Sequence, residues 1–157
     1  MKLRVGDAGP KGKGVFAVDE IHPGEMVIDF AGEEKWIWDI PEELWPHTFQ
    51  VDYDRYILPE SGSPGWCLNH SCEPNCVILG RTRILALKKV APGEELTIDY
   101  STNVGWDGFA MECRCGAPTC RKLIRSYRYL DAGLKARYGA CVSSFLLGRS
   151  ERSGLSA

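Results

Sequence analysis

The run Asn69-His70-Ser71-Cys72-Glu73-Pro74-Asn75-Cys76 carries most of the information about the fold of this chain, together with two segments that follow it. The first is Glu94-Glu95-Leu96-Thr97-Ile98-Asp99-Tyr100, and the second is Cys113-Arg114-Cys115-Gly116 with Cys120. Cysteines in such a pattern are typical of a structural zinc site. Because few folds place a zinc site close to a tyrosine, the combination restricts the fold class strongly.

The composition is that of one globular domain. The chain has 157 residues, 44% apolar and 25% charged, which is enough for one hydrophobic core. Its net charge of −2 argues against direct binding to nucleic acid. No apolar run approaches the roughly 18 to 20 residues of a membrane span, and residues 1–14 do not resemble a signal peptide. We expect a cytoplasmic protein, or a nuclear one if eukaryotic, that is not secreted; the sequence does not predict its oligomeric state.

Short β-prone runs dominate the chain. Residues 15–18 and 26–30 are separated by the turn residues His22-Pro23-Gly24-Glu25, which predicts two paired strands. The same arrangement recurs at 83–90 and 95–100, around a second Pro-Gly-Glu turn. The fold is therefore expected to be mainly β with short helices.

Two segments depart from this pattern. Residues 36–56 are rich in aromatic side chains, contain Pro41-Glu42-Glu43 as a helix start, and lead into an alternating run at 49–58. After the cysteines, apolar residues recur at helical spacing and predict an amphipathic helix that ends near Gly139. Those residues are Leu123, Tyr127, Leu130, Leu134 and Tyr138.

The cysteines are better suited to metal binding than to disulfides. Their number is seven, and Cys113 and Cys115 are too close in sequence to bridge to each other readily. With Cys120 they supply three zinc ligands, so a fourth must come from elsewhere. Cys72 lies in a polar turn and is the best candidate, whereas Cys67 is flanked by Trp66 and Leu68. From spacing alone, free or redox-active cysteines remain the alternative.

Taken together, these motifs resemble those of the SET-domain protein lysine methyltransferases that carry a post-SET zinc segment. The resemblance covers about residues 3–123 and depends on motifs in the family's order. These are Gly12-Lys13-Gly14-Val15-Phe16-Ala17, Pro23-Gly24-Glu25-Met26-Val27-Ile28, the Asn69 to Cys76 run, Gly93 to Tyr100, and the Cys113, Cys115, Gly116 and Cys120 pattern. It implies several small sheets around a pseudoknot, in which the Asn69 segment threads beneath the loop that carries Tyr100. It also implies one zinc ion held by Cys72, Cys113, Cys115 and Cys120.

The resemblance also predicts the domain organisation. A SET domain is expected at residues 1–107, with an insert at about 33–65, followed by the post-SET zinc segment at 108–123. A C-terminal helical extension is expected at 124–147, and the small, polar tail at 148–157 is expected to be disordered.

By the same resemblance, the cofactor is S-adenosylmethionine and the substrate is a lysine of a protein, such as a histone or another basic protein. The cofactor-binding residues would be Gly12, Lys13, Gly14, His47, Asn69, His70 and Met111. The lysine channel would be lined by Phe30, Ile78, Ile98 and Tyr100, with Tyr100 as the catalytic residue. The chemistry agrees, because a glycine pair allows close backbone approach and a buried asparagine can pair with an adenine edge.

Methyl transfer from a sulfonium to an amine is an in-line displacement that needs alignment and a neutral lysine. Tyr100 would orient the amine or the methyl group. At Phe30, Ile78 and Ile98 this chain lacks hydroxyl or aromatic groups that family members usually carry, so we predict products beyond monomethyl-lysine. A catalytically inactive SET-like module that holds a peptide, with zinc only structural, is the alternative. Five tryptophans either line the substrate groove or belong to the core: Trp36, Trp38, Trp45, Trp66 and Trp106.

Overall fold

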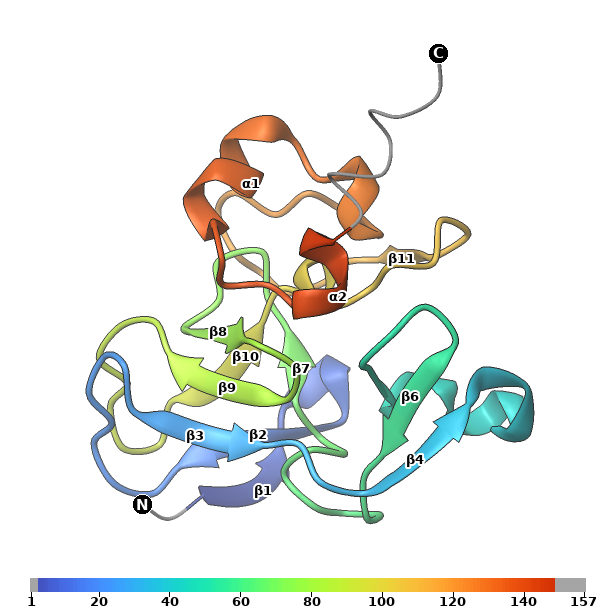
Figure 1. Cartoon of the computed structure of the whole chain (residues 1–157). Coiled ribbons are helices and arrows are strands. Elements are labelled where there is room, and N and C mark those ends of the chain that lie inside the picture. Colours follow the sequence, from blue (N-terminus) through green and yellow to red (C-terminus); the bar gives the residue numbers. More distant parts are fainter. Residues whose placement is uncertain (1–2, 149–157) are drawn as a thin grey trace.

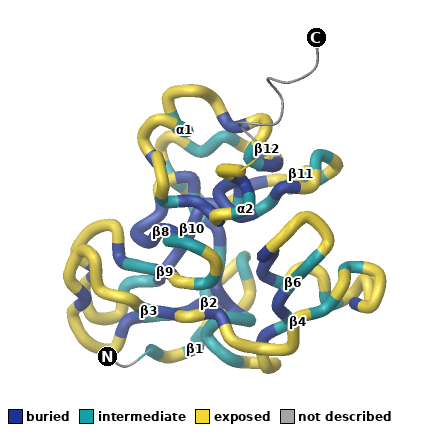
Figure 2. The backbone as a smooth tube through the Cα atoms, in the orientation of Figure 1, coloured by how far each residue is buried: buried dark blue, intermediate teal, exposed yellow. Residues whose placement is uncertain are grey.

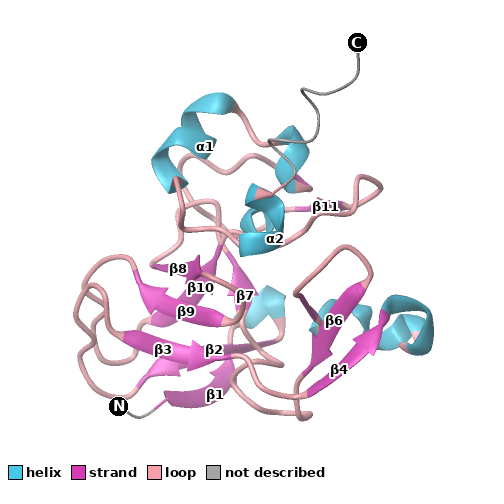
Figure 3. Cartoon of the chain, viewed as in Figure 1, coloured by secondary structure: helices cyan, strands magenta, loops and turns pink. Residues whose placement is uncertain are grey.

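The structure is a computed structural model that describes residues 3–148. Four small sheets contain its strands, and the helices are short (Figures 1 and 3). None of the described helices has the length and apolar character needed to cross a membrane. The expectation of a mainly β fold with small sheets and short helices is confirmed, whereas the predicted tail beyond residue 148 lies outside the described residues.

The sheet nearest the predicted site has the strand order β1-β2-β10-β7. Its strands are β1 (Leu3–Asp7), β2 (Lys13–Ala17), β10 (Glu95–Ile98) and β7 (Asn69–His70). β10 pairs antiparallel with β2 and parallel with β7, with Thr97 opposite Asn69 and Ile98 opposite His70. The segment that begins at Asn69 is therefore held along the strand that leads to Tyr100.

A second sheet has the order β3-β9-β8, with β3 (Met26–Asp29), β9 (Arg83–Ala86) and β8 (Cys76–Leu79). The predicted strands exist, but the predicted pairing of 15–18 with 26–30 is wrong. β2 pairs with β10, and β3 pairs with β9. The two strand-turn-strand units lie side by side, since Ile21 bridges Val90. Each strand of one unit therefore pairs with a strand of the other unit and not with its own neighbour in sequence. Periodicity predicts a strand but carries no information about its partner.

The insert forms a third sheet at one side of the molecule, with the order β4-β6-β5 (Figure 1). Its strands are β4 (Glu33–Trp36), β6 (Arg55–Leu58) and β5 (Phe49–Gln50). Between β4 and β5 lie two 3-10 helices, η2 (Ile37–Asp39) and η3 (Glu42–His47). The helix expected after Pro41 does begin there, but it is a 3-10 helix that contains Pro46, a residue that cannot donate an intrahelical hydrogen bond.

The continuous helix predicted from residue 123 to 138 is wrong. Leu123 belongs to β12 (Leu123–Arg125), which pairs with β11 (Ala110–Glu112) in the fourth sheet. A 3-10 turn η5 (Tyr127–Tyr129) follows, and the helix α1 covers only Ala132–Tyr138, with α2 at Ser144–Leu147. Asp131 caps α1 by accepting from Leu134 N at 2.9 Å, and Gly139 ends it at φ 54°.

The helical spacing has another cause. Tyr127, Leu130, Leu134 and Tyr138 all pack into one small apolar cluster around Val77 of β8. Their side chains therefore face the same way, although the backbone changes from 3-10 turn to α-helix between them. The main core is separate and lies between the sheets, where Figure 2 shows the buried tube of the central strands.

Candidate active site and metal centre

A cavity of about 1340 Å³ lies between the first sheet, the insert and residues 98–111. It brings together most of the predicted site. Among the predicted residues, the lining includes Gly12, Lys13, His47, Asn69 and Met111 of the cofactor set, and Phe30, Ile98 and Tyr100 of the channel set. Three predicted residues are not in the lining: Gly14, His70 and Ile78. Ile78 is fully buried in the main core.

The glycine pair meets two different steric demands. Gly12 ends the turn η1 (Gly9–Lys11) at φ 79°, a left-handed conformation that favours glycine. Gly14 is crowded instead: a Cβ atom there would lie 2.6 Å from Glu95 Oε1 and 3.1 Å from Asn69 Nδ2. The backbone at Gly14 therefore lies directly against the side chains of Glu95 and Asn69, and only glycine leaves room for them.

Asn69 is oriented by its neighbours. Its Nδ2 donates to Lys13 O at 2.8 Å and to Glu95 Oε1 at 2.9 Å. Both amide hydrogens are thus used within the protein, which leaves Oδ1 to accept a hydrogen bond from a ligand. Glu95 also forms an ion pair with Lys11, which lines the cavity. Glu95 was missed from the sequence, although a carboxylate at the start of an apolar strand was a usable signal.

His47 lines the cavity from the insert. Its ring stacks on Trp66 with centroids 4.1 Å apart and an interplanar angle of 10°. Its Nδ1 lies 3.1 Å from Trp66 O. Both side chains line the cavity, so this stack joins the insert to the segment that precedes β7.

Tyr100 follows β10 and opens the turn η4 (Tyr100–Thr102). Its hydroxyl donates to Leu68 O at 2.8 Å, and its backbone N–H donates to His70 Nδ1 at 3.1 Å. Burial, with the nearby charge of Glu95, raises the pKa of the phenol well above its usual value. Tyr100 therefore stays a neutral phenol whose proton is engaged by Leu68, and its oxygen remains available to accept from an amine or a methyl group.

Asp99 fixes the turn that presents Tyr100. The carboxylate is 1% exposed and accepts from Ser101 N at 3.0 Å, Arg121 Nη2 at 2.5 Å and Tyr138 Oη at 3.0 Å. Arg121 directly follows Cys120, and Tyr138 ends α1. A buried carboxylate needs several such donors. The turn at Tyr100 is therefore held from both the cysteine segment and the C-terminal extension.

Tyr138→Phe removes one of these donors without changing the ring. We expect the free energy of unfolding to fall by about 1–3 kcal/mol, because Asp99 loses a hydrogen bond in a site that water cannot reach. Denaturant titration of wild type and variant measures this difference. Tyr129→Phe is the control, since Tyr129 is half-exposed, and it should leave the stability close to that of the wild type. Equal effects of the two substitutions would contradict the role given to Tyr138.

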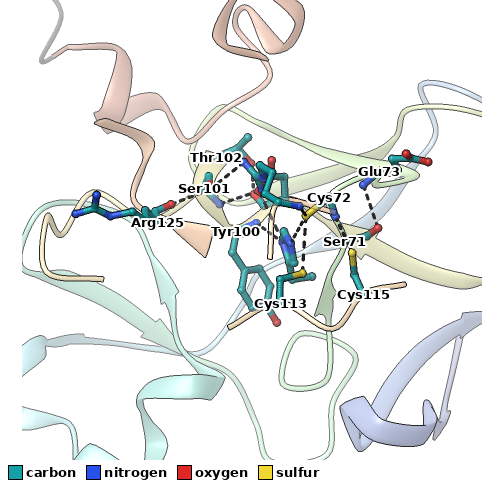
Figure 4. Close-up of polar contacts among 12 residues, drawn as sticks. Ser71, Cys72, Glu73, Tyr100, Ser101, Thr102, Cys113, Cys115 and Arg125 are labelled. Atoms are coloured by element: carbon teal, nitrogen blue, oxygen red, sulfur yellow. Dashed lines mark hydrogen bonds and ion pairs between the residues drawn. The ribbon is translucent and has the colours of Figure 1, made fainter. Parts of the chain in front are cut away.

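The predicted metal ligands converge beside this turn, as Figure 4 shows for Cys72, Cys113 and Cys115. The ligand atoms of these three residues and of His70 lie within 4.8 Å of one another. Cys120 falls outside that group, although its Sγ lies 3.7 Å from Cys113 O. Burial raises the pKa of Cys113, whereas hydrogen bonds from Cys72 N and Ala117 N outweigh burial and lower that of Cys115 to about 6. This donor set fits zinc, which binds thiolates tetrahedrally.

His70 has a different part in this cluster. Burial lowers its pKa to about 4, so the imidazole is neutral at pH 7. Because Nδ1 accepts from Tyr100 N, the proton lies on Nε2, which is 3.4 Å from Cys72 Sγ. His70 thus donates a hydrogen bond to the Cys72 sulfur and links it to the backbone of Tyr100. The ligand atoms that converge are therefore those of His70, Cys72, Cys113 and Cys115, and Cys120 as the fourth ligand stays a prediction.

Comparison with known proteins agrees with this geometry. Residues 12–101, more than half of the chain, match the SET domain family. The chain belongs to the SET domain family. The segments that place Asn69, the glycine pair and Tyr100 all lie within the matched range. The C-terminal extension and the predicted zinc ligands Cys113, Cys115 and Cys120 follow it.

Named relatives of this SET domain are much longer proteins. The histone-lysine N-methyltransferase trithorax of Drosophila virilis is 34% identical over 130 residues, which cover 72% of this chain and 3% of that protein. The histone-lysine N-methyltransferase TRX1 of Oryza sativa subsp. japonica is 33% identical over 154 residues, 87% of this chain and 15% of the relative. The chain thus spans a small part of these relatives.

A solved structure shares the fold. KRYPTONITE in complex with mCHH DNA, an H3(1-15) peptide and SAH aligns with a TM-score of 0.59 and 29% sequence identity. The alignment covers 78% of this chain and 29% of that chain.

Proposed function

We propose that this SET domain transfers a methyl group from S-adenosylmethionine to the side-chain amine of a lysine in a protein substrate. The observation that carries this proposal is that one cavity is lined by the glycine loop, Asn69 and Tyr100. Support also comes from the histone-lysine N-methyltransferase relatives and from the related structure with SAH. A lysine-bearing protein, such as a histone, is the substrate class, which fits a nuclear location in a eukaryote.

The cofactor would occupy the end of the cavity formed by the glycine loop and β7. Backbone groups at Gly12 and Lys13 would approach it, and Asn69 Oδ1 would accept a hydrogen bond from it. His47 and Met111 supply apolar and aromatic surface on the facing walls. Gly14 and His70 do not line the cavity but support residues that do. Gly14 leaves room for the side chains of Asn69 and Glu95, and His70 Nδ1 accepts a hydrogen bond from the backbone N–H of Tyr100.

The reaction needs alignment more than acid–base chemistry. Placing the sulfonium, methyl and amine in line can supply about 7–11 kcal/mol of the barrier reduction. Deprotonating a lysine with a pKa of about 10.4 at pH 7 costs roughly 4 to 5 kcal/mol. Burial beside the cationic sulfonium lowers the pKa of the amine and offsets this cost. The phenol oxygen of Tyr100 then accepts a hydrogen bond from the neutral amine and orients it.

The channel favours multiple methylation. Phe30 stacks on Phe49 with centroids 4.0 Å apart. Ile98, two residues before Tyr100 in the sequence, is buried. Neither side chain can hydrogen-bond to water or to a methylated amine. A monomethylated lysine is therefore free to rotate and present its lone pair again. Only monomethyl-lysine on a true substrate at exhaustion of the reaction would reject this product assignment.

Calorimetric titration with S-adenosylmethionine and with S-adenosylhomocysteine tests the proposed function. We expect saturable binding of both, with an affinity that falls about tenfold or more in Asn69→Ala, since the ligand loses a hydrogen bond to the oriented Asn69 Oδ1. Glu112→Ala, which changes an exposed carboxylate outside the cavity lining, is the control. Absence of binding to the zinc-loaded wild type would instead favour an inactive SET-like module that holds a peptide.

A further inference from the structure

The insert carries an exposed stack of aromatic and cationic groups. The guanidinium carbon of Arg55 lies 4.4 Å from the ring centroid of Trp36. Trp36 in turn stacks on Trp38, with centroids 5.0 Å apart and an interplanar angle of 10°. Trp38 is 66% exposed, so its second face is open. The order is therefore guanidinium, indole, indole and then solvent.

This stack borders the cavity that holds Tyr100. Trp38 and Tyr100 are both lining residues of the one cavity of about 1340 Å³. A peptide that places a lysine at Tyr100 and extends along the insert side of this cavity would meet Trp38. Trp38 is too exposed for a core residue, and with Trp36, which is 42% exposed, it forms a contiguous exposed aromatic pair of the kind that marks interaction sites.

The charge of the insert selects the sign of the ligand. Residues 33–55 contain seven acidic and two basic residues, a net charge of −5, whereas the whole chain carries −2. Both basic residues are paired, Lys35 with Glu33 at 3.0 Å and Arg55 with Glu34 at 3.1 Å. The other five carboxylates form no salt bridge within the described part of the chain: Asp39, Glu42, Glu43, Asp52 and Asp54.

Such a surface attracts a cation and repels nucleic acid and anionic lipid. Asp54 itself lines the cavity together with Trp38. Of the two basic side chains, arginine has the planar guanidinium that stacks on an indole while its edge hydrogen-bonds to a carboxylate. The chain already makes this contact internally at Arg55 and Trp36. The open face of Trp38 offers the same contact to a second guanidinium.

We propose that Trp38 is a docking platform for an arginine side chain of the substrate, so that preferred substrates carry an arginine near the target lysine. This inference rests on the proposed function, because it assigns the ligand at Trp38 to the same peptide that presents the lysine. It commits to arginine rather than to a general basic segment. The acidic residues would raise the rate of encounter, and the stack would supply the specificity.

A double-mutant cycle tests the platform by binding alone. Lysine peptides with an arginine placed at successive distances from the lysine are titrated into the zinc-loaded protein with S-adenosylhomocysteine, and each is compared with its glutamine counterpart. At one distance, we expect the arginine peptide to bind about 5- to 30-fold more weakly to Trp38→Ala than to wild type, as for loss of a cation–π contact. The glutamine peptide should bind both proteins equally.

Trp106→Ala is the matched control, because Trp106 is 57% exposed and lines the same cavity. It should not distinguish the arginine peptide from the glutamine peptide. Equal loss for both peptides in Trp38→Ala, or no loss at any distance, would overturn the platform. The cycle needs no turnover, so a protein that shows the arginine coupling but transfers no methyl group would overturn only the proposed function.

Discussion

Tyr100→Phe is expected to lower the rate of methyl transfer by roughly 100-fold or more, the size of effect seen when one oriented polar group is removed from a reacting centre. The ring still fills its place, but the oxygen that receives the amine is gone, and so is the hydrogen bond to Leu68 O at 2.8 Å. Affinity for S-adenosylmethionine should stay nearly unchanged, because Asn69 and the glycine loop are untouched. Single-turnover rates and calorimetry separate the two quantities.

Tyr56→Phe is the matched control for this substitution. Tyr56 lines the same cavity, and burial raises the pKa of its phenol to about 12, so it too is a neutral phenol at pH 7. No part of the proposed mechanism uses its hydroxyl, and the rate should stay close to that of the wild type. Equal activity of Tyr100→Phe and the wild type would contradict the catalytic role of Tyr100.

Removal of zinc is expected to have the largest effect on stability. Structural zinc sites supply about 10–16 kcal/mol of binding free energy, and each kcal/mol moves the melting temperature of a domain of this size by roughly 2–4 °C. We therefore expect a strong chelator to lower the melting temperature by well over 10 °C. Calorimetric scans before and after chelation, with zinc content measured on the same samples, give the comparison.

The same treatment should weaken cofactor binding by about tenfold or more, because Asn69 lies three residues before Cys72 and Met111 lies two before Cys113. The metal thus fixes two walls of the cavity. Cys141→Ser is the control, since Cys141 lies outside the ligand cluster among the described residues, and this variant should keep its zinc content and its cofactor affinity. Unchanged cofactor affinity in metal-free protein would show that the metal and the cavity are independent.

Several features of the site could be predicted from the sequence because the chemistry is carried by short, local motifs. Asn69, Cys72 and Tyr100 belong to runs in which side-chain type and spacing together identify a role. The strand pairing could not be predicted in this way. Residues 15–18 and 26–30 are strands, but they pair with β10 and β9, and these long-range pairings, with the bridge of Ile21 to Val90, have no local sequence signature.

The C-terminal region shows a second limit of pattern-based prediction. Four side chains at helical spacing pack against Val77, and the same spacing arises from a 3-10 turn followed by a short helix. The contact of Tyr138 with Asp99, at 3.0 Å, joins residues 39 positions apart and has no local signature. The orientation of Asn69 by Glu95 likewise depends on the parallel pairing of β7 with β10. Local patterns identify the elements, and tertiary contacts set their partners.

Mass spectrometry of a protein substrate pool offers the most direct test of the central proposal. Histones and other basic proteins are incubated with the zinc-loaded protein and S-adenosylmethionine that carries an isotopically labelled methyl group. We predict labelled methyl groups on lysine ε-amines, with di- or trimethyl-lysine among the products, and their loss in Tyr100→Phe. A protein that binds both zinc and S-adenosylmethionine but labels no lysine in any pool would contradict the assignment as a lysine methyltransferase.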